Sequence, residues 1–206
     1  MTGRLGAWRG ADGQQLRLFV AVWVPHEVRV QLAELVAGLR RKHEGVHWTQ
    51  PEGYHVTLAF LGKVMADQRE VGQALDDLDL SPATTTIGPE LRMFGRSVLY
   101  APVQGLDEIA ATMQEAMAPF TEKPDDHPFT GHVTLARLPG GRTGRRRRSS
   151  VGFVQEWLGT PVSAEWSTDA ISIVHSERTR SGTVYHEIHH RSIYPGGYRG
   201  KWFDSL

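Results

Sequence analysis

The chain has 206 residues, 40% of them hydrophobic and 22% charged, and its 23 basic and 23 acidic side chains cancel. A formal charge of zero argues against a global attraction to nucleic acid, and the absence of cysteine excludes disulfides, thiolate catalysis and cysteine-ligated zinc. The absence of cysteine also fits the cytoplasmic location that we expect. No apolar run approaches the roughly 20 residues that cross a bilayer, so we expect no membrane partner.

The two ends of the chain lack the patterns of packed elements. Residues 1–15 contain no apolar stretch, which argues against a secretory signal, and we expect them to be disordered. Residues 195–206 follow Pro195-Gly196-Gly197 and are expected to form an irregular tail. We therefore predict one domain over residues 16–194, acting as a monomer.

The first half of this domain begins with a near-continuous apolar run over residues 18–24, as expected of a strand buried on both faces. Residues 26–42 carry apolar side chains on one helical stripe and predict a helix. The same reasoning predicts, in order, an extended piece at 46–49, a strand from His55 to Gly62, a helix at 66–78 and strands at 83–87 and 91–94.

The second half repeats this order. It predicts, in sequence, a strand at 97–103, a helix at 106–118, a strand from His132, a helix at 151–158 and strands at 162–166 and 170–176. A last strand at 183–189, preceded by a turn at Ser181-Gly182, has no counterpart in the first half. The repeat predicts duplicated β-α-β-α-β-β lobes, over roughly 16–95 and 96–176, related by a pseudo-two-fold axis.

Two stretches that read almost alike stand at the same place in the two halves, His-Val-Thr-Leu-Ala-Phe from His55 and His-Val-Thr-Leu-Ala-Arg from His132. Side chains two residues apart on a strand share a face, so each histidine faces the same way as its threonine, Thr57 or Thr134. A single such triplet is common by chance, whereas the repeat predicts that two matching sites face one cleft.

Two opposed histidines suit in-line displacement at phosphorus, which needs a base beside the attacking oxygen and an acid beside the leaving oxygen. Imidazole serves either role near neutral pH. Thr57, Thr134 and Arg137 are candidate phosphate-binding residues, through hydrogen bonds and charge. Arg137 lies an odd number of residues from His132, so a regular strand would point it to the other face, and a bulge or the strand end must turn it.

The paired motif resembles that of the 2H phosphoesterases, and within them the RNA 2′,3′-cyclic phosphodiesterases, also described as 2′–5′ RNA ligases. Supporting pieces of the resemblance are Arg17-Leu18-Phe19-Val20-Ala21, Phe60-Leu61-Gly62, Ser176, Gly182 and Tyr185. It covers residues 16–190. Pro51-Glu52-Gly53-Tyr54 departs from the family, where Asn-Leu is more usual.

The resemblance implies an α+β fold with antiparallel sheets around a central cleft, and hydrolysis of a 2′,3′-cyclic phosphodiester without a metal or cofactor. It implies that His55 is the proton donor and His132 the proton acceptor, giving a 2′-phosphate on RNA ends or nucleotides. Two alternatives stay open: the same fold acting on another cyclic phosphate or a 2′–5′ linkage, and a non-catalytic RNA- or nucleotide-binding module.

Further residues are candidates for contact with a base or with RNA. Trp48, Phe60 and Tyr185 could stack on a base, although a core position is the commoner fate of such aromatics. Arg145 and Arg146 belong to a basic run over residues 142–148 that could guide RNA, although most such runs are solvated loops. We expect no metal site at His186, His189 and His190, because no carboxylate cluster accompanies them in the sequence.

Overall fold

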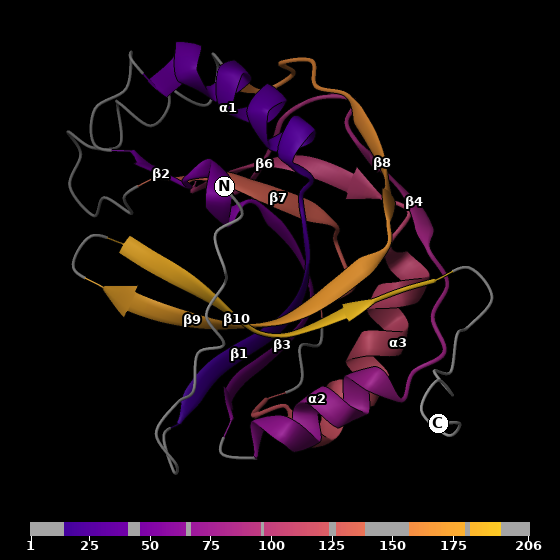
Figure 1. Ribbon diagram of the computed structural model, residues 1–206. Coiled ribbons are helices and arrows are strands. Elements are labelled where there is room, and N and C mark those ends of the chain that lie inside the picture. Colours follow the sequence, from indigo (N-terminus) through magenta and orange to yellow (C-terminus); the bar gives the residue numbers. More distant parts are fainter. Residues whose placement is uncertain are drawn as a thin grey trace, which may run out of the picture.

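The computed structural model describes residues 15–40, 46–64, 67–95, 97–123, 127–138, 157–179 and 182–194 (Figure 1). The first half contains β1 (Leu16–Trp23), α1 (His26–Arg40), β2 (His47–Trp48), a 3-10 turn (Pro51–Gly53), β3 (His55–Val64), α2 (Gln68–Asp76), β4 (Ala83–Ile87) and β5 (Arg92–Phe94). The second half contains β6 (Val98–Gln104), α3 (Asp107–Met117), a 3-10 turn (Ala118–Phe120), β7 (His132–Arg137), β8 (Ala164–Thr168), β9 (Ala170–Thr179) and β10 (Gly182–Ser192).

The predicted elements agree with this order, and their ends follow local chemistry. The helix predicted from residue 66 begins later, because the Asp67 side chain accepts a hydrogen bond from the Arg69 backbone N–H at 2.9 Å and caps α2. The helix predicted at 151–158 lies outside the described residues except for its end, where Trp157 is helical and fully buried. None of the described helices is long and apolar enough to cross a membrane.

The described strands pair antiparallel throughout, in the order β10-β9-β1-β3-β7-β6-β4-β8, with β2 added to β7 and β5 added to β6. Together with the helices this is the predicted α+β fold. The two motif strands, β3 and β7, are neighbours and meet at Val56 and Val133, which hold the same position in the two motifs. The pairing order is the same on both sides of these residues, since β1 lies next to β3 as β6 lies next to β7.

The two halves of the sequence exchange strands on either side of this central pair. β5 comes from the first half but pairs with β6, and β9 comes from the second half but pairs with β1. β4 and β8, at equivalent places in the two halves, pair with each other. Each end of the sheet is thus built from both halves of the sequence, and hydrophobic periodicity has no means of predicting this exchange.

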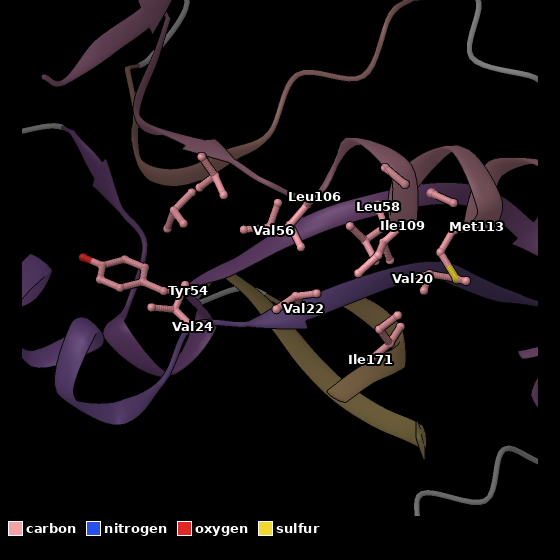
Figure 2. Packing of buried hydrophobic residues seen from close by; sticks show 14 of the residues in the cluster. Val20, Val22, Val24, Tyr54, Val56, Leu58, Leu106, Ile109, Met113 and Ile171 are labelled. Atoms are coloured by element: carbon pink, nitrogen blue, oxygen red, sulfur yellow. The ribbon is translucent and has the colours of Figure 1, made fainter. Parts of the chain in front are cut away.

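The main core lies on one face of the sheet. Figure 2 shows Val20 of β1 beside Met113 of α3, and Leu58 of β3 beside Ile109 of α3. Burying each of these side chains contributes about 1.5–3 kcal/mol relative to exposure. This face fixes the strand register, because a slip of one residue would expose the apolar set and bury the motif side chains.

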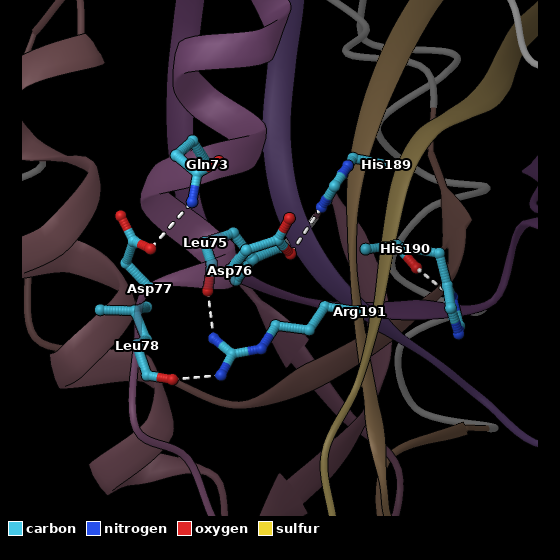
Figure 3. Close-up of polar contacts among 9 residues, drawn as sticks. Gln73, Leu75, Asp76, Asp77, Leu78, His189, His190 and Arg191 are labelled. Atoms are coloured by element: carbon cyan, nitrogen blue, oxygen red, sulfur yellow. Dashed lines mark hydrogen bonds and ion pairs between the residues drawn. The ribbon is translucent and has the colours of Figure 1, made fainter. Parts of the chain in front are cut away.

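β10 is longer than predicted, and its alternate residues hold α2 in place (Figure 3). The Arg191 guanidinium donates hydrogen bonds to the carbonyl oxygens of Leu75 and Leu78, at the end of α2. His189 Nε2 donates to Asp76 Oδ1 at 2.8 Å. The Leu75 carbonyl also accepts the Leu78 backbone N–H at 3.3 Å, and Leu78 lies two residues beyond α2. These contacts therefore tie β10 to the C-terminal end of α2 and to the turn that follows it.

Candidate active site

The face of the sheet opposite the main core carries the polar side chains of both motifs. In β3, Val56 and Leu58 are buried in the core, whereas His55 and Thr57 are only partly buried. β7 has the same pattern, with buried Val133 and Leu135 and partly buried His132 and Thr134. We call this surface the motif face.

Both motif strands have a β-bulge at their leucine. The residues on either side of Leu58 pair with consecutive residues of β1, and those on either side of Leu135 pair with consecutive residues of β6. A bulge shifts the alternation by one residue, so Phe60 and Arg137 lie on the motif face. Arg137, which a regular strand would point to the core, thus faces the histidines.

The bulges leave two backbone carbonyls outside the strand ladder, and both find other donors. Gln114 Nε2, from α3, donates to the carbonyl oxygen of Leu58 at 3.2 Å. The backbone N–H of Thr49 donates to the carbonyl oxygen of Leu135 at 2.9 Å. Since a buried unpaired carbonyl costs about 1–3 kcal/mol, these bonds stabilise the bulges and hence the direction of Phe60 and Arg137.

The two histidines are held in the same tautomer. His55 Nδ1 donates to the carbonyl oxygen of Gly53, and His132 Nδ1 donates to that of Thr130, each at 2.7 Å and each two residues back along the chain. A carbonyl oxygen only accepts, so both protons lie on Nδ1 in the neutral ring. Nε2 of each ring is thereby left to exchange a proton with a substrate.

The pKa values of both histidines are lowered. Burial brings the pKa of His55 down to about 4 against the opposing effect of the Gly53 carbonyl, and the charges of His132 and Arg137 lower it further. Burial and then Arg137 lower the pKa of His132, opposed by the Thr130 carbonyl. Arg137 therefore acts on both rings, and its charge does not by itself separate an acid from a base.

Aromatic rings surround His55. Phe19 and Trp23 of β1 and Tyr185 of β10 lie 4.9, 5.7 and 4.9 Å from it, centroid to centroid. Trp23 Nε1 donates to Glu187 Oε2 at 2.9 Å, which fixes that ring. These neighbours desolvate His55, and one of them, Tyr185, is a candidate base-contact residue from the sequence.

His132 has a smaller aromatic setting, from residues that sequence reasoning missed. Phe94 of β5 and Tyr100 of β6 lie 4.8 and 5.6 Å from its ring. Phe94 is 37% exposed, and it lines a cavity of about 460 Å³ together with Thr57, Phe60 and His132. A cavity of this size is in the range of small-molecule sites.

The remaining predicted contact residues are distributed differently. Trp48 packs on Trp157, 5.0 Å away, against the main core, whereas its neighbour His47 is exposed opposite Arg137 on the motif face. Phe60 is 42% exposed on the motif face. Arg145 and Arg146, with the whole basic run, lie outside the described residues.

The histidines of β10 each face a different carboxylate, and these are single pairs rather than the carboxylate cluster that a metal site needs. His186 contacts Glu177 at 3.0 Å, His189 contacts Asp76, and His190 lies 3.6 Å from Glu187. Successive residues alternate between the two faces of the sheet, so these pairs do not converge. Among the described residues, no three His, Asp or Glu side chains are grouped to hold a metal ion.

Known proteins resemble this chain in sequence. The LigT-like phosphoesterase family matches residues 22–87. A protein of Thermus thermophilus named RNA 2′,3′-cyclic phosphodiesterase is 27% identical over 190 residues, 82% of this chain and 86% of that protein. A protein of Thermotoga maritima with the same name is 24% identical over 133 residues, 60% of this chain and 70% of that protein.

Solved structures share the fold. TT0787 of Thermus thermophilus superposes with a TM-score of 0.67 at 25% identity, covering 86% of this chain and 98% of that one. Escherichia coli LigT in complex with 3′-AMP gives a TM-score of 0.66 at 22% identity, covering 88% and 100%. The resemblance to the LigT-like phosphoesterases and the α+β fold that it implies are therefore confirmed.

Proposed function

We propose that this LigT-like phosphoesterase of the 2H family hydrolyses the 2′,3′-cyclic phosphodiester at RNA ends or on nucleotides to a 2′-phosphate. The observation that carries the proposal is that the two histidines make equivalent hydrogen bonds. In each ring Nδ1 donates to the carbonyl oxygen two residues back, which leaves Nε2 to exchange a proton with the substrate. In-line displacement needs one proton acceptor and one proton donor on opposite sides of phosphorus, and this pair supplies both.

In the proposed reaction His132 Nε2 takes a proton from water as the water oxygen bonds to phosphorus. The bond from phosphorus to the 3′ oxygen breaks, and His55 Nε2 gives its proton to that oxygen. One water is consumed, and the product carries a 2′-phosphate and a 3′-hydroxyl. The two rings then recover their starting states by exchanging protons with solvent. The assignment of the acid to His55 rests on the family resemblance.

The bound phosphate also affects the protonation of the two histidines. Both histidine pKa values are lowered in the free protein, so the neutral form of each ring dominates at pH 7. A bound phosphodiester anion opposes the effect of Arg137 and raises the pKa of a neighbouring imidazole. Substrate therefore helps to protonate the acid that its own hydrolysis requires.

Phosphate and nucleoside occupy different parts of the motif face in this proposal. Thr57 and Thr134 donate hydrogen bonds to the non-bridging oxygens, and Arg137 neutralises the charge. The terminal nucleoside enters the cavity beside His132, where the exposed rings of Phe60 and Phe94 offer apolar surface for a base.

A substrate panel tests the proposal. Purified protein treated with excess chelator is given a 2′,3′-cyclic mononucleotide, an RNA with a cyclic-phosphate end and a 2′–5′ dinucleotide. We expect hydrolysis of the first two. Turnover of the dinucleotide alone favours the alternative linkage, binding without turnover favours the non-catalytic module, and activity that returns only with added metal contradicts the two-histidine mechanism.

A further inference from the structure

A second bulge in β3 brings two cations together beyond the motif. The residues on either side of Leu61, Phe60 and Gly62, pair with consecutive residues of β1, and Gly62 accommodates the bulge with a φ of +76°. As a consequence Lys63 lies directly opposite Arg17. Both side chains are exposed, on the same face as Phe60 and the motif residues.

This pairing is unfavourable in the protein alone. Like charges directly opposite each other on neighbouring strands repel and are destabilising. The Glu122 carboxylate accepts a hydrogen bond from the Lys63 backbone N–H at 3.0 Å, not from its ammonium group. Within the described ranges, neither Arg17 nor Lys63 forms an ion pair with a carboxylate.

Arg17 is connected to the active site through Phe60. The Arg17 guanidinium lies 5.0 Å above the Phe60 ring, and Phe60 lines the cavity that reaches Thr57 and His132. Burial raises the pKa of Tyr185, whose ring contacts His55, and the charges of Arg137 and Arg17 both oppose this rise. A chain of aromatic and cationic side chains thus leads from the histidines to the end of β3.

We propose that Arg17 and Lys63 bind a backbone phosphate of single-stranded RNA, upstream of the cyclic end held at the histidines. This inference rests on the proposed function and adds a preference for oligonucleotides over mononucleotides. Arg17 is four residues along β1 from Ala21, the partner of Thr57, which places the cations about 13 Å from the motif at roughly 3.3 Å per residue. A cyclic mononucleotide has no further backbone phosphate that could reach the two cations, so they add little to its affinity.

The first test measures binding, independent of turnover. A fluorescein-labelled RNA hexamer with a 2′,3′-cyclic phosphate end is titrated into His132→Ala protein, with and without Arg17→Ala plus Lys63→Gln, across salt. Loss of one phosphate contact should flatten the log–log salt dependence by ~0.7. Between 50 and 200 mM salt the parent should then lose about 2.6-fold more affinity than the variant, from the fourfold salt change raised to 0.7.

The second test compares substrates in the active protein. The double variant should lower the ratio of kcat/KM for the hexamer to kcat/KM for the cyclic mononucleotide, through KM. Arg17→Lys, which keeps the charge, should retain most of the ratio, and Arg69→Ala, which removes an exposed cation from α2, should leave it unchanged. An unchanged ratio and salt slope in the double variant overturn the inference.

The two proposals fail separately. A protein that hydrolyses neither substrate contradicts the proposed function, while the hexamer titration still decides whether the cations bind RNA. Melting curves check that the variants are folded.

Discussion

The burial of the two histidines makes a specific prediction for the pH dependence of catalysis. The proposed reaction needs one protonated and one neutral histidine. In the free protein the pKa of His55 is about 4, and that of His132 is also lowered from 6.5. Because kcat/KM reports the ionisation of the free enzyme, its maximum should lie below pH 6.5.

The magnitude follows from these pKa values. At pH 7 roughly one molecule in 1,000 carries the His55 proton, since each pH unit above the pKa lowers the protonated fraction about tenfold. From pH 6.5 to 8.5 kcat/KM should therefore fall by about 100-fold. This sign is independent of which histidine is the acid. kcat should remain flat to higher pH, because bound phosphate raises the pKa of both rings.

Initial rates on a 2′,3′-cyclic mononucleotide, followed from pH 4.5 to 8.5 at constant ionic strength, provide the assay. Arg137→Gln removes a charge that lowers both pKa values, so its falling limb should move to higher pH while its overall rate drops. Arg69→Gln, on α2, is the control and should keep the parental profile. A kcat/KM that rises between pH 6.5 and 8.5, or a limb that Arg137→Gln leaves in place, would refute the reasoning.

Further predictions concern single groups. Alanine at His55 or His132 should each cost 10²–10⁴-fold in rate, and with a nitrophenyl leaving group, which needs no acid, only the His55 variant should recover; the reverse pattern means that the roles are exchanged. Alanine at either motif threonine should cost roughly 10²–10³-fold or less, measured as kcat on the same cyclic substrate. Gln114→Leu should destabilise the protein by about 1–3 kcal/mol in denaturant unfolding, since it leaves the bulge carbonyl of β3 unpaired; an unchanged midpoint means that water replaces the amide. Serine in place of the four arginines at 145–148 should weaken RNA turnover and reduce its salt dependence by ~0.7 per lost phosphate contact, and equal behaviour of variant and parent means a solvated loop.

Much of the fold could be predicted from local patterns. Period-2 alternation around His55 and His132 identified both motif strands, and helical stripes identified α1, α2 and α3. The exchange of β5 and β9 could not be predicted in this way, because it depends on pairing between distant segments. Periodicity describes which residues of a strand share a face and says nothing of the partner.

The active site, too, could be predicted only in part from local patterns. The motif residues are visible in the sequence, and the odd spacing of Arg137 required a bulge or a strand end to turn it. The structure supplies the bulge, at Leu135. The sequence does not show which of His47 and Trp48 faces the cleft. The pairing of β2 with β7 places His47 opposite Arg137 and Trp48 opposite Ala136, and so assigns each residue to a face of the sheet. The carbonyl groups of Gly53 and Thr130, which accept the Nδ1 protons of the two histidines, could not be predicted from the sequence, because every residue has a backbone carbonyl.

The central claim is that two histidines cleave a cyclic phosphodiester at its 3′ oxygen. Phosphorus NMR of the products from a 2′,3′-cyclic mononucleotide, incubated with protein and excess chelator, tests it most directly. We predict a single 2′-phosphate resonance, formed by the parent protein and lost in both His55→Ala and His132→Ala. A 3′-phosphate product, or hydrolysis that persists in both variants, would contradict the account.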